Sequence, residues 1–99
     1  MKAYRQGDVI LFCGSVIPVG ALRLDHLTLA KGEATGHSHR ITEGSAQLYE
    51  HEGVLYLQVL SDIATLSHEQ HERIGLPMDN YMIRIQREYQ PEGWTEVVD

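Results

Sequence analysis

The segment that most constrains the fold is YMIRIQREY, residues 81–89. Every second residue at its start is a large apolar one, namely Tyr81, Ile83 and Ile85. Successive side chains of a β-strand point to opposite faces of the sheet, so a period of two predicts a strand with one buried face. Such a strand needs neighbours that pair with it and an apolar layer that covers one face. The alternation therefore predicts a sheet-based core.

Two segments in the first third of the chain also favour strands. GDVILFC, residues 7–13, is a continuous apolar run after the turn-forming pair Gly7-Asp8. A run without alternation predicts a strand that is covered on both faces. LRLDHLTLA, residues 22–30, is a weaker candidate. Both segments add strands to the expected sheet.

The middle of the chain predicts a hairpin. AQLYE (46–50) and VLYLQVL (54–60) are strand-like, and the polar HEG between them ends on Gly53. Short polar connections that contain glycine are typical of hairpin turns. In this hairpin we expect Tyr49 and Tyr56 to be cross-strand partners.

The segment SDIATLSHEQHERIG, residues 61–75, has two interpretations. Asp62 is a suitable cap for a helix with sparse apolar contacts, whereas IATLS within the segment also favours a strand. Gly75 and Pro77 are expected to end this element, and PMDN predicts a turn into the last strand. The segment therefore contributes either a short helix or another strand.

These elements predict an all-β fold of five to seven strands with at most one short helix. The chain has 99 residues, is 42% hydrophobic and shows no internal repeat or linker, which favours one domain over residues 1–99. Short strands separated by turns at this spacing are typical of small barrels and sandwiches. We expect a small barrel or a jelly-roll-like sandwich.

The charge balance argues against nucleic acid as a partner. Fourteen acidic and eight basic side chains give a formal charge of −6. Proteins that grip a phosphate backbone usually carry a patch of Lys and Arg, and here the arginines are scattered. Nucleic-acid binding stays an alternative only if Arg84 and Arg87 form a positively charged stripe on one strand.

The same composition predicts a cytoplasmic protein without a membrane segment. The chain has one cysteine, Cys13, which lies in an apolar run and is expected to pack in the core rather than to act as a nucleophile. No apolar stretch is long enough to cross a bilayer, and the first residues lack the apolar core of a signal peptide.

The histidines are the residues that point to chemistry. The chain has six, and GEATGHSHRITE places His37 and His39 two apart. In an extended segment both rings project to one face, where they can bind one metal ion. Neutral imidazole suits zinc, iron, nickel and copper. Metal-free binding, acid–base chemistry and a purely structural role are the alternatives for this pair.

A metal needs further ligands, because zinc sites use three or four. HEQH places His68 and His71 three apart, which brings them together on a helical turn or a tight loop but separates them on a strand. His51 and His26 are weaker candidates. Carboxylates lie nearby in the chain: Glu43, Glu50, Glu52, Glu69 and Glu72. Arg40 is a candidate for holding an anionic ligand, with a solvated or salt-bridged arginine as the alternative.

The stretch HSHRITE resembles the centre of the first cupin motif. In that motif a His-x-His pair and a following glutamate are metal ligands, and the resemblance implies these roles for His37, His39 and Glu43. The glycine that closes the motif is replaced by Glu50, and the second cupin motif is not found. Where the resemblance holds, it implies a β-barrel with a metal site.

A second resemblance covers more of the chain. RQGDVIL, TGHSHRI, LSHEQH, LP and IQREY together resemble a recurrent pattern in small bacterial and phage-borne proteins without an established function. This likeness implies a compact β unit and supplies no reaction.

Two functional hypotheses follow from the residues. The first is a β domain with a metal or small-ligand site lined by His37, His39, His68 and His71, with Arg40 and Glu43 as further ligand-binding residues. The second is an adaptor without catalysis, which binds a protein partner or forms a homo-oligomer through Tyr89, Trp94 and the edge of the last strand. No catalytic triad or phosphate-binding loop is visible, so the sequence assigns no reaction.

Overall fold

Eight antiparallel strands and no helix make up the part of the chain that the computed structural model describes, residues 2–32 and 36–86. The all-β prediction is therefore confirmed. The strands are β1 (Ala3–Gln6), β2 (Val9–Phe12), β3 (Leu22–Arg23), β4 (Thr28–Lys31), β5 (Ser38–Glu43), β6 (Ala46–His51), β7 (Val54–His68) and β8 (His71–Ile85).

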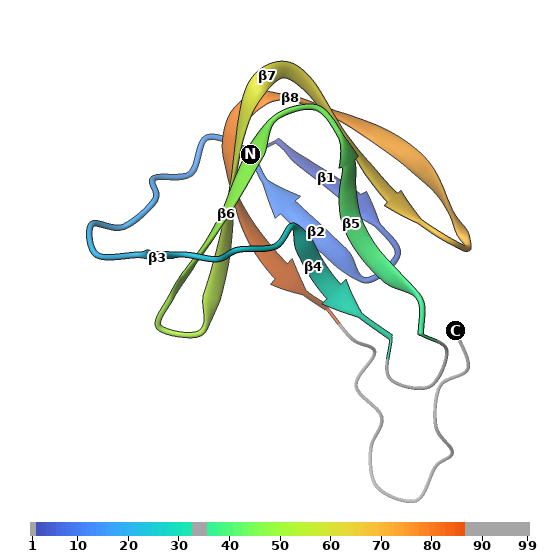
Figure 1. The fold of residues 1–99 in the computed structure, drawn as a ribbon, viewed down its shortest axis with the longest axis horizontal. Helices are drawn as coiled ribbons and strands as arrows, with labels where there is room; N and C mark the ends of the chain where they lie inside the picture. The colour runs from blue at the N-terminus through green and yellow to red at the C-terminus, as the bar shows by residue number, and fades with distance from the viewer. Residues whose placement is uncertain (1, 33–35, 87–99) are drawn as a thin grey trace, which may run out of the picture.

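The strands form one curled sheet, a half-barrel, with the order β1-β2-β8-β7-β5-β4 (Figure 1). Strand β6 pairs with the first half of β7, β5 pairs with its second half, and β3 pairs with β6. Strands β7 and β8 are each 15 residues long and arch over the top of the molecule (Figure 1). Their pairing shifts register between Val59 and Ile63, and such an irregularity bends a sheet.

The bend explains why Gly75 and Pro77 do not end an element, contrary to the sequence-based expectation. Both lie inside β8, where Gly75 pairs with Thr65 and Pro77 pairs with Ile63 next to the register shift. Proline lacks an N–H group, and an irregular site is where a sheet tolerates it. Residues 61–75 therefore form the second half of β7, the turn and the start of β8, and the helical interpretation is wrong.

The core lies inside the curl of the sheet. The alternation in the last strand is confirmed, because Tyr81 and Ile83 are buried while Arg84 is exposed. The fully buried large side chains are Tyr81, Leu11, Leu48, Leu57, Leu66, Leu76, Val9 and Val59. In β2 only alternate residues are fully buried, and Ile10 and Phe12 between and after them are half-buried, so the second face of this strand is covered only in part. Cys13 is half-buried against this core.

The middle hairpin is present, with Tyr49 opposite Tyr56 as expected. Its turn is formed by Glu52 and Gly53, which both have positive φ angles, 52° and 81°. Two positive φ angles define a type I′ turn, in which Asn-Gly is the favoured pair. Glutamate is a poor residue for the first of these positions.

We therefore expect Glu52→Asn to raise the free energy of unfolding by about 0.5–1 kcal/mol, because asparagine tolerates positive φ better. Urea unfolding at neutral pH measures the change. Glu50→Asn is the control, since Glu50 lies inside β6, where asparagine is disfavoured. If Glu52→Asn is no more stable than the natural protein, turn strain does not limit this hairpin.

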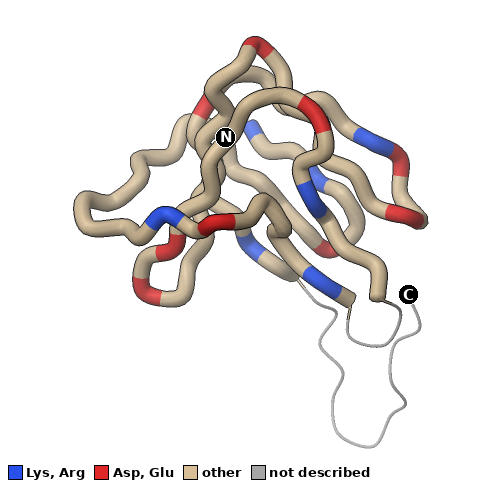
Figure 2. The backbone as a smooth tube through the Cα atoms, viewed as in Figure 1, with Lys and Arg blue, Asp and Glu red and all other residues tan. Residues whose placement is uncertain are grey.

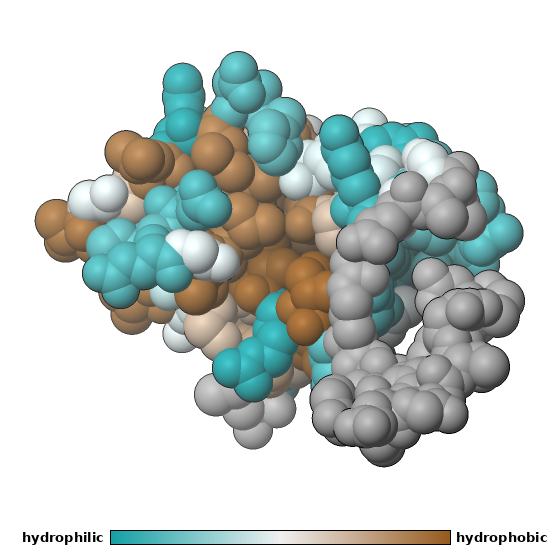
Figure 3. Space-filling model, turned by 90° about the horizontal axis from the view of Figure 1, so that it is seen from below, coloured by the Kyte–Doolittle hydropathy of each residue, from teal (hydrophilic) through white to brown (hydrophobic). Residues whose placement is uncertain are grey.

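The surface shows no concentrated positive charge over the described residues. Lys and Arg are spread along the strands and alternate with Asp and Glu (Figure 2). Apolar side chains are exposed on the β2–β3 connection, at the left of Figure 1, where Val16 is 83% and Val19 101% exposed. Viewed from below, hydrophobic residues gather over the left and centre of the molecule (Figure 3).

Some sequence-based expectations fall on residues that are not described. Tyr89 and Trp94, the expected partner contacts, lie outside the described ranges, as does Arg87. Residues 22–30 form two short strands rather than one, β3 and β4. The described part of the chain contains no helix that is long and apolar enough to span a membrane.

Candidate metal centre at the hairpin junction

Four histidines come together where the β7–β8 turn and the β1–β2 turn meet the start of β5, at the right of Figure 1. We call His37, His39, His68 and His71 the histidine cluster. His68 is at its centre, with ring centroids 4.2 Å from His39, 4.6 Å from His71 and 5.6 Å from His37. The rings of His39 and His71 are stacked at 5.8 Å. The fold thus joins two sequence motifs that are about thirty residues apart.

The local structure explains how the rings meet. His68 and His71 are cross-strand partners on either side of the two-residue turn Glu69-Gln70, so they are brought together by a tight turn and not by a helix. His39 lies in β5, and His37 just precedes that strand. Alternation along an extended chain sends both rings to one side. Both contact His68 there.

His39 is almost fully buried, with 5% of its surface exposed. Its Nδ1 lies 2.8 Å from Oε1 of Gln6, and its Nε2 lies 3.5 Å from Oδ1 of Asp8. Burial, assisted by the neighbouring His68, lowers the pKa of His39 to about 4. Burial and the neighbouring His71 also lower the pKa of His68. Both rings are therefore neutral at pH 7, the form that binds metals.

Glu69 supplies a carboxylate beside these rings. Its Oε1 accepts a hydrogen bond from the amide of Ser38 at 3.0 Å, and its Oε2 accepts one from Arg40 at 2.9 Å. The backbone hydrogen bond from Ser38 and the Arg40 guanidinium lower the pKa of Glu69 to about 2. Arg40 is thus a salt-bridged residue that orients Glu69.

Three members of this region are close enough to share one ion. His37, His68 and Glu69 each offer a ligand atom, and these three atoms lie within 4.8 Å of one another. Two of the three come from the β7–β8 hairpin and the third from the segment before β5. The group is half-buried to exposed, so an ion can reach it from solvent.

Other candidates from the sequence lie elsewhere. Glu43 is four residues along β5 from His39, and it accepts a hydrogen bond from Thr65 at 3.0 Å. His26 accepts a hydrogen bond from the amide of Thr28, and His51 contacts Glu52. Neither His26 nor His51 has a ring contact with the histidine cluster among the described residues.

Gln6 and Asp8 were missed as site residues by reasoning from the sequence. Gln6 and Asp8 lie in RQGDVIL, His37 and His39 in TGHSHRI, and His68 and His71 in LSHEQH. The structure shows what these segments share, since all three reach the same end of the half-barrel. Gln86 donates its backbone amide to the carbonyl of Asp8 at 2.8 Å.

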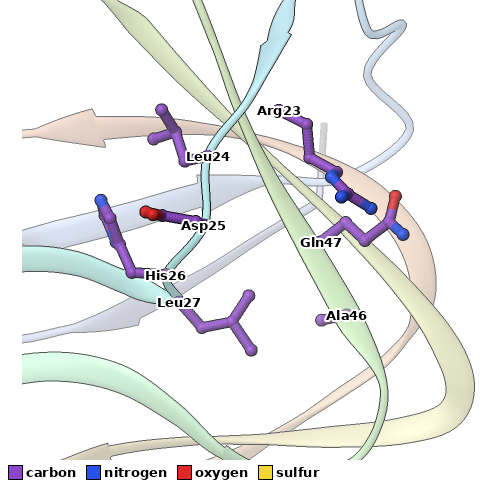
Figure 4. A pocket seen from close by; sticks show the side chains of 7 residues that line it. All are labelled: Arg23, Leu24, Asp25, His26, Leu27, Ala46 and Gln47. Atoms are coloured by element: carbon purple, nitrogen blue, oxygen red, sulfur yellow. The ribbon is translucent and has the colours of Figure 1, made fainter.

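A separate hollow of about 400 Å³ lies between residues 23–27 and strand β6 (Figure 4). The side chains of Arg23 and Gln47 lie beside each other on one side of it (Figure 4). Among its lining residues the only histidine is His26, and none belongs to the histidine cluster. The hollow and the cluster are therefore different sites.

Comparison with known proteins assigns the chain to a family without assigning a reaction. Searches of curated proteins and of solved structures found no match. A family model described as "Domain of unknown function (DUF8820)" matches residues 5–86, a range that runs from within β1 to the end of β8 and includes every residue of the histidine cluster. The chain therefore belongs to the DUF8820 family.

Proposed function

We propose that this protein binds a divalent transition metal at the group formed by His37, His68 and Glu69. The observation that carries the proposal is the approach of one ligand atom from each residue to within 4.8 Å of the other two. Two imidazoles and one carboxylate are the ligands of several catalytic zinc sites and of non-haem iron(II) sites. Zn²⁺ and Fe²⁺ are the ions that this donor set fits best.

The protonation states favour the same conclusion. A metal ligand must lose its proton before it binds, so a group that is already deprotonated at pH 7 binds more tightly. The pKa of Glu69 is lowered to about 2, and the pKa of His68 is lowered by burial and by His71. Arg40 and the Ser38 amide hold the carboxylate in place, as outer hydrogen bonds do around metal ligands.

Three protein ligands leave coordination positions open for water or another small oxygen ligand. A metal in such a position supplies Lewis acidity, and it lowers the pKa of a bound water. The protein's own residues orient the Glu69 carboxylate, and they lower the pKa values of Glu69 and His68. The proposed function is therefore a metal-binding β domain whose metal is accessible to small ligands.

Removing a ligand tests the proposal. We expect protein purified without a histidine tag to bind Zn²⁺, and Glu69→Gln to weaken that binding at least about 100-fold, because it removes a charged ligand. Metal analysis after dialysis and titration calorimetry measure the effect. Glu43→Gln is the matched control, since it removes a carboxylate from β5 away from the rings. Binding of Zn²⁺ that is equal in both variants, or absent from the natural protein, contradicts the proposal.

A second readout reports on His68 itself. Nδ1 of His68 accepts a hydrogen bond from the Gln70 amide at 3.0 Å. A neutral ring that binds metal through Nδ1 loses this acceptor, and one that binds through Nε2 carries its proton on Nδ1. Either way the Gln70 hydrogen bond is lost. We expect Zn²⁺ to shift the Gln70 amide resonance strongly, and a resonance that does not move argues against His68 as a ligand.

A further inference from the structure

Residues 16–22, which we call the apolar loop, project from the half-barrel at the left of Figure 1. The segment reads VIPVGAL and contains no charged or hydrogen-bonding side chain. Val16 and Val19 are largely exposed, and 70% of the surface of Leu22 is exposed as well. Apolar side chains that are gathered on one projecting segment, rather than scattered singly, are typical of a surface that contacts another molecule.

Hydrogen bonds hold the apolar loop in this projecting shape. At its base the amide of Ser15 donates to the carbonyl of Asn80 at 3.0 Å, and Oγ of Ser15 accepts the amide of Met82 at 3.1 Å. At its tip the amide of Ala21 donates to the carbonyl of Pro18 at 3.1 Å, which closes a turn. A loop that is already ordered loses little conformational entropy when it binds, so its exposed side chains are suited to a contact.

The apolar loop leads directly into the hollow between residues 23–27 and β6 (Figure 4). Leu24, Leu27 and Ala46 form the apolar part of this hollow, and all three pack against the core. Leu22 and Leu24 are two residues apart in a segment that pairs with β6, so their side chains lie on the same face. Figure 3 shows hydrophobic residues over the left of the molecule, where the apolar loop lies, and toward its centre. A projecting and a hollowed apolar feature are thus neighbours on this chain.

Two opposite charges flank the hollow on different sides. Arg23 lies beside Gln47 on one side, whereas Asp25 points to the other side (Figure 4). Both charged residues are exposed, and neither forms an ion pair with any of residues 2–32 and 36–86. Such an arrangement is complementary to itself. A two-fold axis that faces one copy of the chain against another exchanges the two sides and brings each Arg23 next to the partner's Asp25.

A second copy of the chain accounts for all of these features. Each partner in a stable interface buries roughly 800 Å² of surface, which is more than the exposed side chains of the apolar loop alone supply. A two-fold pair uses each contact twice, because the loop of one copy meets the hollow of the other and the reverse. A different protein would have to supply both a matching hollow and the reversed charges, whereas this chain carries both itself.

We propose that two copies of the chain associate about a two-fold axis, with the apolar loop of each seated in the hollow of the other and Arg23 paired with the partner's Asp25. The apolar loop lies at the left of Figure 1 and the histidine cluster at the right, so the dimer leaves the proposed metal site open to solvent. The two surfaces share no residue. The dimer can therefore fail while the proposed function stands, and the reverse.

Sedimentation velocity from micromolar to submillimolar protein, with EDTA present, tests the dimer. We expect the natural protein to form a dimer and Val19→Asp to weaken the association at least about 30-fold, because the variant places a charge in the middle of an apolar contact. Val19 is fully exposed in the single chain, so its replacement does not disturb folding. Ile63→Asp is the matched control. It places the same charge on an exposed apolar residue at the bend of β7 and should associate as the natural protein does.

Charge reversal tests the orientation of the two copies. Arg23→Asp and Asp25→Arg should each weaken the association about 10-fold, because each places like charges next to each other across the interface. The double variant should associate as the natural protein does, since the reversed charges again face each other in opposite pairs. Loss of folding in a single variant would not be repaired in this way.

Several results overturn the dimer. The first is a natural protein that stays monomeric at submillimolar concentration, and the second is a dimer that forms only when metal is added. A dimer that Val19→Asp leaves unchanged uses another surface and contradicts the proposed one. Single charge reversals that weaken the dimer without rescue in the double variant contradict the pairing of Arg23 with the partner's Asp25.

Discussion

Gly44→Ala is expected to lower the free energy of unfolding by at least about 3 kcal/mol. Gly44 has a φ of 92°, a backbone conformation in which an L-residue is strained by about 1–2 kcal/mol. A Cβ at this position would also lie 2.5 Å from the carbonyl oxygen of Ile63 and 2.8 Å from Cα of Ala64. Both are backbone atoms of β7 that cannot turn aside, and such overpacking adds about 1–3 kcal/mol.

The position matters because the β5–β6 turn holds the bend of the sheet. Ser45 accepts the amide of Leu60 at 2.8 Å, and its own amide donates to the side chain of Ser61 at 2.9 Å. These hydrogen bonds attach the turn to β7 where its pairing with β8 shifts register. An added methyl group at Gly44 therefore forces the turn away from the bend of the half-barrel.

Gly20→Ala separates the two contributions to this effect. Gly20 has the same φ of 92°, but no atom lies within 4 Å of an added Cβ. We expect this variant to lose only the strain of about 1–2 kcal/mol. Urea unfolding of both variants gives the comparison. Equal losses would mean that the approach of Ile63 and Ala64 to Gly44 does not limit stability.

Acid is expected to destabilise the metal-free protein by about 3 kcal/mol as the pH falls from 6.5 to 4, through His39 alone. The pKa of His39 is about 4 in the folded protein, because burial and then His68 disfavour the charged ring, against 6.5 when unfolded. Between these two pH values the unfolded chain binds more protons than the folded protein. The contribution of His39 to stability is therefore fully present above pH 6.5 and is lost as the pH falls toward 4. The pKa of His68 is also lowered in the folded protein, so its protonation destabilises the protein in the same direction.

Urea unfolding of the natural protein and of His39→Gln between pH 5 and 7 measures this effect. Glutamine does not titrate, so the stability of the variant should vary less with pH in this window. His26→Gln is the control, because His26 is exposed and outside the cluster. Because the pKa of Glu69 is lowered from 4.5, its protonation affects stability only below about pH 4.5. Measurements above pH 5 therefore exclude the contribution of Glu69. A His39→Gln variant with the same pH slope as the natural protein would show that His39 is not the responsible group.

Most of the fold could be predicted from the sequence, because strand signals are local. The alternation of Tyr81 and Ile83 and the hairpin that pairs Tyr49 with Tyr56 both agree with the structure. The β7–β8 bend could not be predicted in this way. Its register shift depends on contacts between β7, β8 and the β5–β6 turn, and no window of sequence contains all three.

The candidate site shows the same division. His37, His39, His68 and His71 attract notice in the sequence, and the structure brings all four together. Which carboxylate lies beside the four rings depended on the fold. Glu69 lies beside the rings and Glu43 does not, because Glu43 is four residues along β5 from His39, whereas Glu69 follows His68 directly at the hairpin turn.

The sequence by itself determined the period of the strands, the position of the β6–β7 hairpin turn and the presence of ring nitrogens suited to metals. These follow from side-chain alternation and from residue chemistry, which act over a few neighbours. Only the tertiary structure decided that Gln6 and Asp8 meet His39. Those contacts cross more than thirty residues of chain, and they form because the curled sheet brings the β1–β2 turn against the start of β5.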